Sequence, residues 1–96
     1  MEALALALAA CMSMDVVHIL RKGRCDLRGL RTTLAGRRAR ESPRRFLAIE
    51  LHFVVTGKVP IDQVERAVDL SRETYCSVWQ SMRQDIDLRV SIEVQP

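Results

Sequence analysis

Residues 3–14 read ALALALAACMSM, a run without a charged side chain. Alanine and leucine are strong helix formers and Gly23 supplies a stop, so the sequence predicts a helix from Glu2 to about Lys22. The first half of this helix is apolar on every face, and such a helix must be buried all round. A small sheet covers only one side of a helix. We therefore expect another subunit or a further segment to cover the other side.

The composition places the chain among small globular proteins. Its 96 residues are 48% hydrophobic, which predicts one domain, residues 1–96, with its own core. A net charge of +3 from 15 basic and 12 acidic residues describes a mixed surface, and an aromatic content of 4% disfavours a stacking platform for nucleic acid. The three cysteines are widely spaced and form no CxxC motif. We expect a reducing, cytoplasmic compartment and no nucleic-acid partner.

The rest of the chain alternates between strand-like and helix-like patterns. Residues 27–39 and 47–55 carry extended patterns on either side of a polar turn at residues 41–44, which predicts an antiparallel hairpin. Apolar residues then recur at helical spacing, and nothing between residues 62 and 83 forces a break, although Ser71 and Thr74 could each cap a new helix. Residues 86–94 alternate as a half-buried strand. The order helix, strand, strand, helix, strand predicts an α+β fold with an antiparallel or mixed sheet.

The N-terminal apolar run resembles two kinds of membrane-directed segment, a lipoprotein signal and a membrane-spanning helix. Leu8-Ala9-Ala10-Cys11 matches the four-residue bacterial lipobox, but no positively charged region precedes it and the helical pattern continues after it. A membrane span is also disfavoured, because the uncharged run 3–14 is short and Asp15 follows it. We therefore expect neither a lipid anchor nor a membrane partner.

Several side chains could carry chemistry. Cys11, Asp15 and His18 share one face of the predicted helix and are metal-ligand types, but a buried cysteine is favoured over a metal site because no fourth ligand is visible. Seven residues of helix put His18 about 10 Å from Cys11, too far for a base. An ionised Asp15 opposes a thiolate at Cys11, so activation needs a cation from elsewhere. Cys25, in a basic loop, would be a mildly activated thiol if exposed, but an incidental loop cysteine is favoured, and Cys76 on its own is a small core residue.

Four segments together resemble the OsmC/Ohr family. Residues 2–20, with CMSMDVVHIL from Cys11 onward, resemble the central helix of that family, and YCSV at residues 75–78 resembles its second cysteine segment. LHFVVTG at 51–57 and VERAVDLS at 64–71 are similar to the OsmC-like branch, so the resemblance covers nearly the whole chain. It implies an intertwined homodimer in which sheets wrap two long central helices. It also implies a helix break just before the second cysteine.

The resemblance further implies a peroxiredoxin-like chemistry in oxidative-stress defence, without a cofactor. Cys11 would be the thiolate that attacks the O–O bond of an organic hydroperoxide and becomes a sulfenic acid. Cys76 would resolve that sulfenic acid as a disulfide, which an external dithiol of the lipoyl type reopens.

One part of the family pattern is not matched by these 96 residues. Family members carry strands before the central helix, and these strands donate the arginine that activates the first cysteine. Glu2 matches the glutamate that orients this arginine. We expect the arginine to come from strands that would precede the helix, outside these 96 residues. Two hypotheses follow: a hydroperoxide reductase that uses Cys11, Cys76 and Glu2, or a non-catalytic dimeric module that lacks the activating arginine.

Overall fold

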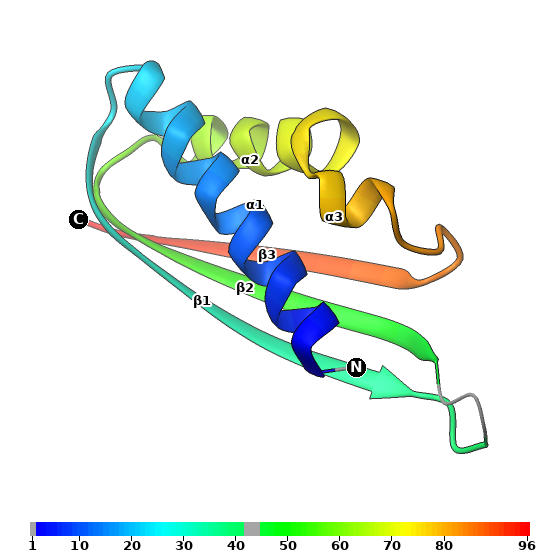
Figure 1. The fold of residues 1–96 in the computed structure, drawn as a ribbon. Helices are drawn as coiled ribbons and strands as arrows, with labels where there is room; N and C mark the ends of the chain where they lie inside the picture. The colour runs from blue at the N-terminus through cyan, green and yellow to red at the C-terminus, as the bar shows by residue number, and fades with distance from the viewer. Residues whose placement is uncertain (1, 42–44) are drawn as a thin grey trace.

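The structure, a computed structural model, describes residues 2–41 and 45–96, with Glu2 described by its backbone only. Three strands form one sheet, and all the helices lie on one face of it, with α1 crossing the strands (Figure 1). This is the predicted α+β fold. The elements in chain order are α1 (Glu2–Lys22), β1 (Asp26–Arg38), β2 (Phe46–Lys58), α2 (Ile61–Leu70), the π-helical turn η1 (Ser71–Tyr75), α3 (Ser77–Gln80) and β3 (Asp87–Gln95).

The sheet has the strand order β1-β2-β3 and is mixed. The first two strands form the predicted antiparallel hairpin, in which Leu34 lies opposite Leu51. The expected turn at 41–44 falls mostly outside the described residues, which exclude 42–44. The helical connection then returns the chain in the same direction, so β3 pairs with β2 in parallel and Val90 lies opposite Leu51.

The core lies between α1 and the inner face of the sheet. Leucine, methionine and valine recur every fourth residue along α1, and every second residue of β2 faces them. The buried side chains of α1 and those of β2 therefore meet between the helix and the sheet, where they form one hydrophobic core. Its fully buried side chains include Leu8, Met12, Val16 and Leu20 of α1 and Ile49, Leu51, Phe53 and Val55 of β2.

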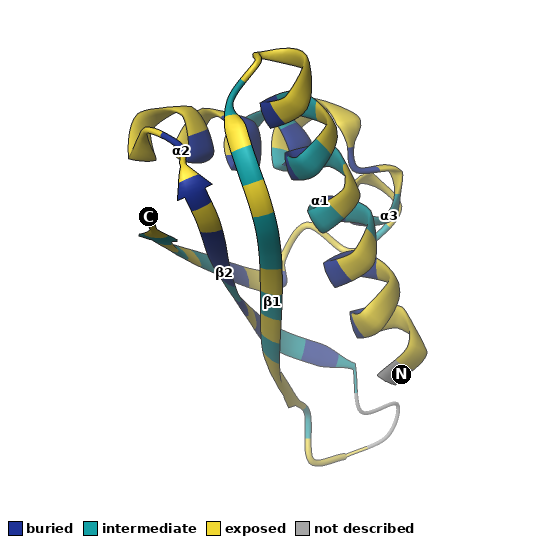
Figure 2. Cartoon of the chain, turned by 90° about the vertical axis from the view of Figure 1, so that its left-hand side faces the viewer, coloured by how far each residue is buried: buried dark blue, intermediate teal, exposed yellow. Residues whose placement is uncertain are grey.

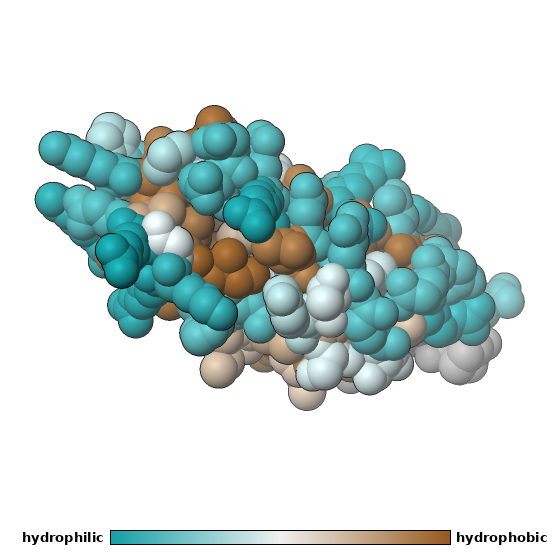
Figure 3. All heavy atoms as spheres, turned by 90° about the horizontal axis from the view of Figure 1, so that it is seen from above, coloured by the Kyte–Doolittle hydropathy of each residue, from teal (hydrophilic) through white to brown (hydrophobic). Residues whose placement is uncertain are grey.

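The opposite face of α1 is open. Leu6 is 60% exposed and Met14 is 72% exposed, and buried and exposed residues alternate along the helix (Figure 2). A view onto the helical side shows hydrophobic surface between hydrophilic side chains (Figure 3). Burial on every face, expected from the sequence, is therefore not achieved within one chain, because the sheet reaches only one side of the helix.

The length of α1 bears on the membrane question. Residues Ala3–Lys22 have a mean hydropathy of 2.0 and are long and apolar enough to cross a membrane by length and composition. The sequence-based prediction of a segment too short to span a membrane rested on the uncharged residues 3–14 alone, whereas the apolar helix extends to Lys22. Mostly buried core helices and N-terminal signal sequences meet the same criteria, and in α1 a third of the residues of this segment are buried, where the helix packs on the sheet.

The helical connection between β2 and β3 is broken, although nothing in the apolar spacing of residues 62–83 forced a break. Regular helix ends at Leu70, a π-helical turn follows, and Cys76 is extended, with φ −76 and ψ 98. In this wide turn the N–H of Cys76 donates to the carbonyl of Ser71 at 2.7 Å. The break before the second cysteine, which the family resemblance implied, is thus confirmed.

Candidate functional site

Two of the three cysteines meet at the break. Cys11 on α1, Cys76 at the start of α3 and Asp15 bring two sulfur atoms and a carboxylate oxygen within 4.8 Å of one another. Cys11 and Asp15 point the same way because they are one helical turn apart. Of the three side chains that the sequence aligned on this face, His18 does not join the cluster and is exposed. Its place is taken by Cys76, which is distant in the sequence.

Burial differs between the members of this thiol–carboxylate cluster. Cys76 is fully buried, whereas Cys11 and Asp15 are half-buried. The cysteines are present as free thiols. A solute that approaches from solvent therefore reaches Cys11 before Cys76.

Ser71 supports the cluster from the π-helical turn. Its side chain is fully buried, and its hydroxyl donates a 2.7 Å hydrogen bond to Oδ2 of Asp15. Ser71 is not among the site residues expected from the sequence. A signal was available, because Ser71 occupies the next position of the buried stripe formed by Val64, Ala67 and Val68, where an apolar residue is expected.

The environment of Cys76 favours the neutral thiol. The pKa of Cys76 is raised to about 11, chiefly by burial; the backbone N–H of Trp79 opposes this shift, and the neighbouring Cys11 adds to it. That N–H donates to the Cys76 sulfur at 3.4 Å, which makes Cys76 the cap of α3. At neutral pH this thiol keeps its proton, so an attack by its sulfur requires that the proton be removed.

The other two sequence candidates lie away from the cluster or outside the described residues. Glu2 is the first residue of α1, and its side chain is outside the described part of the chain. Cys25 is half-buried between α1 and β1, near Gly23. About 18 Å of helix separates Gly23 from Cys11, so Cys25 is remote from the two other thiols.

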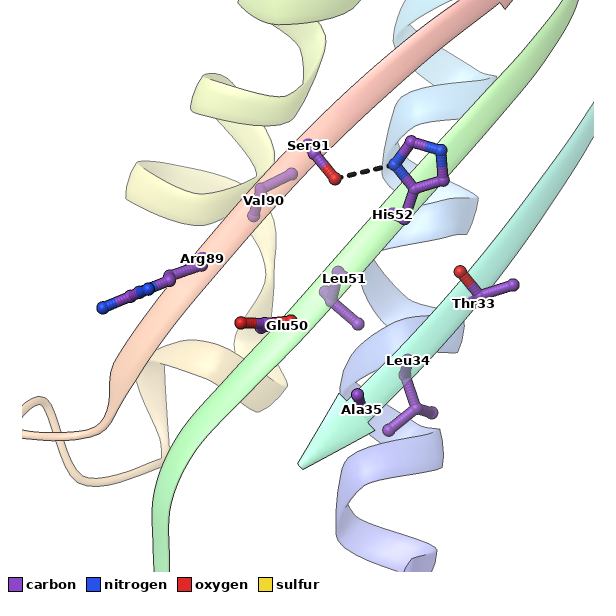
Figure 4. Close-up of a pocket in the computed structure, with 9 residues that line it drawn as sticks. All are labelled: Thr33, Leu34, Ala35, Glu50, Leu51, His52, Arg89, Val90 and Ser91. Carbon is purple, nitrogen blue, oxygen red and sulfur yellow. Dashed lines mark hydrogen bonds between the residues drawn. The ribbon is translucent and has the colours of Figure 1, made fainter. Parts of the chain in front are cut away.

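A separate hollow lies on the outer face of the sheet. It has a volume of about 340 Å³ and is lined from all three strands, with Glu50, His52 and Arg89 among its polar residues (Figure 4). His52 Nδ1 and Ser91 Oγ form a 2.7 Å hydrogen bond across it. Side chains alternate along a strand, so these residues face away from α1 and the thiols. This hollow is an ordinary polar strand surface.

The sequence model of the family described as "OsmC-like protein" matches residues 1–91 of the chain. The chain belongs to the OsmC-like family. It is 44% identical over 95 residues to the protein YhfA of Escherichia coli strain K12, a match that covers 98% of this chain and 71% of YhfA. The resemblance to the OsmC/Ohr family drawn from the sequence is therefore confirmed.

Solved structures show the same OsmC-like fold. A hypothetical protein from Aquifex aeolicus VF5 superposes with a TM-score of 0.94 at 36% identity, over 98% of this chain and 71% of that one. An organic hydroperoxide resistance protein OsmC from Legionella pneumophila superposes with a TM-score of 0.78 at 21% identity, over 97% of this chain and 67% of that one. The second likeness concerns the fold alone.

Proposed function

We propose that this OsmC-like chain reduces organic hydroperoxides with Cys11 as the attacking thiolate and Cys76 as the resolving thiol. The observation that carries the proposal is the placement of the two sulfurs within 4.8 Å of each other, although they come from separate helical segments. Family context adds support, since the Legionella pneumophila relative is named as an organic hydroperoxide resistance protein. The more exposed of the two sulfurs is the one that meets the peroxide first.

The proposed reaction moves two electrons. The Cys11 thiolate attacks one oxygen of the hydroperoxide, the O–O bond breaks, and the alkoxide leaves and takes up a proton as the alcohol. Cys11 is then a sulfenic acid. The Cys76 sulfur attacks the Cys11 sulfur, the S–O bond breaks, and hydroxide leaves with the Cys76 proton as water. An external dithiol of the lipoyl type reduces the resulting disulfide.

The surroundings of Cys11 support an alkyl substrate. Cys11 is half-buried, and it packs against the hydrophobic core. Because this side of the site is apolar, it favours the hydrocarbon part of an organic hydroperoxide over a more polar peroxide.

Two further parts of the proposal come from the family. Glu2 orients an arginine that stabilises the Cys11 thiolate, and a second copy of the chain covers the exposed face of α1. The resulting homodimer works in the reducing cytoplasm, where the thiols are kept available.

One observation favours the non-catalytic alternative. The Asp15 carboxylate lies within 4.8 Å of both sulfurs, and a negative charge at that distance opposes formation of a thiolate. A chain in which nothing offsets this charge keeps the fold and the dimer but reacts slowly with peroxide.

The test is consumption of tert-butyl hydroperoxide by the reduced protein in the presence of dihydrolipoamide. We expect Cys11→Ser to abolish consumption and Cys25→Ser, the matched control, to retain it. Cys76→Ser should complete the first step and accumulate a sulfenic acid that dimedone traps. If the wild-type chain consumes no peroxide, and Asp15→Asn restores consumption, the non-catalytic alternative is supported.

A further inference from the structure

The donor atoms of the thiol–carboxylate cluster also have the types and spacing of a metal site. We propose that Cys11, Cys76 and Asp15 bind Zn²⁺ in the reduced protein. Zn–S bonds of about 2.3 Å at tetrahedral angles place two sulfurs roughly 3.8 Å apart. The three donor atoms lie within 4.8 Å of one another, so small side-chain rotations bring them onto one ion.

The ligands are held by neighbouring hydrogen bonds, as metal ligands usually are. The buried Ser71 hydroxyl donates to Oδ2 of Asp15 at 2.7 Å, and a carboxylate that accepts this bond still offers an oxygen to an ion. On the other side, the Trp79 N–H donates to the Cys76 sulfur at 3.4 Å and stabilises negative charge there. Both bonds orient the ligands before an ion arrives.

The donor set selects the metal. Two thiolates favour a borderline-soft ion, whereas Ca²⁺ and Mg²⁺ require oxygen ligands. Two cysteines and one carboxylate leave the fourth tetrahedral position of Zn²⁺ open for water or another small ligand. The half-buried Cys11 and Asp15 provide the route from solvent to the buried Cys76.

Binding must displace protons from both thiols. A doubly charged ion offsets the two thiolates and the carboxylate, which would otherwise repel one another. We therefore expect the affinity for Zn²⁺ to rise with pH.

One consequence of the site rests on the proposed function, although the site itself does not. The same two sulfurs cannot both coordinate Zn²⁺ and form a disulfide. When a hydroperoxide oxidises the two thiolates by two electrons in total, it takes up two protons from solvent and is reduced to alcohol and water, the O–O bond breaks, the S–S bond forms, and Zn²⁺ is released with its charge unchanged. Bound Zn²⁺ in turn slows the attack of Cys11 on peroxide.

The experiment uses the full reduced chain without peroxide, so its result is independent of the proposed activity. Zn²⁺ binding is measured by competition with a chromophoric chelator, and Co²⁺ is used as a spectroscopic substitute. We expect one metal per chain and a sulfur-to-cobalt charge-transfer absorption. Cys11→Ser or Cys76→Ser should weaken binding more than about 100-fold, and Ser71→Ala, which removes only a supporting bond, roughly tenfold.

Two controls separate this site from adventitious binding. Cys25→Ser and His18→Ala remove metal-ligand types outside the cluster and should leave the affinity unchanged.

Asp15→Asn keeps an oxygen for the Ser71 bond, so it tests the ligand without removing that support, and it should weaken binding at least about tenfold. Circular dichroism checks that each variant is folded. Absence of the charge-transfer band, or equal loss of affinity in Cys25→Ser, would overturn the proposal.

Discussion

Ser71 donates a 2.7 Å hydrogen bond from its buried hydroxyl to Oδ2 of Asp15, and this bond ties the break in the second helical segment to the central helix. The carbonyl of the same serine accepts the N–H of Cys76, also at 2.7 Å. One residue therefore positions both the carboxylate and the backbone of the second cysteine.

Removal of the Ser71 hydroxyl should destabilise the fold. In Ser71→Ala the half-buried Asp15 carboxylate loses its hydrogen bond, and we expect the free energy of unfolding to fall by about 1–3 kcal/mol. Ser91→Ala is the matched control, because Ser91 makes a bond of the same 2.7 Å length to His52 on the exposed face of the sheet. Its cost should stay below about 1 kcal/mol. Urea unfolding measures both, and equal costs would contradict the structural role of Ser71.

The proposed redox pair makes a prediction about cross-links. Protein treated with organic hydroperoxide and digested without reductant should yield a peptide pair joined through Cys11 and Cys76, because these sulfurs are adjacent and Cys25 is not. Mass spectrometry identifies the pair. A dominant disulfide that contains Cys25 would show that the adjacent thiols are not the reacting ones.

Glutamate substitutions at two neighbouring alanines separate an effect on folding from an effect on dimerisation. Ala9 is 8% exposed and faces the core, so Ala9→Glu buries an unpaired charge and should cost several kcal/mol of unfolding free energy. Ala10 lies on the exposed face of α1, and Ala10→Glu should leave a folded chain that no longer dimerises. Sedimentation velocity and urea unfolding together separate the two effects. If the wild-type chain is a well-folded monomer and Ala10→Glu behaves identically, this face is not a dimer interface.

The buried Cys76 thiol should make stability depend on alkaline pH. Burial raises the pKa of Cys76 from an ordinary 9.0 to about 11. Between these values the unfolded chain loses the proton while the folded chain keeps it, so the free energy of unfolding falls as pH rises, by about 3 kcal/mol at most. Below pH about 9 this contribution is constant. Urea unfolding of reduced wild type and Cys76→Ala at several pH values measures it. The decline should be steeper in wild type, and parallel curves would contradict the raised pKa.

Local patterns were sufficient to predict most of the fold. The uncharged run before Asp15 and the alternation along residues 47–55 correctly predicted α1 and the hairpin, because helix and strand periodicities are properties of neighbouring residues. The break at Cys76 was not visible in the apolar spacing. At this break Ser71 donates a hydrogen bond to Asp15, a contact between distant segments that periodicity does not report.

By itself, the sequence determined the central helix, the strands and the family, and it showed that this helix carries more apolar surface than one small sheet can cover. Only the tertiary structure decided which side chains meet. Helical spacing put His18 on the same face as Cys11 and Asp15, yet the third donor in the cluster is Cys76, which the π-helical turn carries against α1. The physical reason is that periodicity reports which residues share a face, whereas the partner of that face is set by packing and by hydrogen bonds between distant segments.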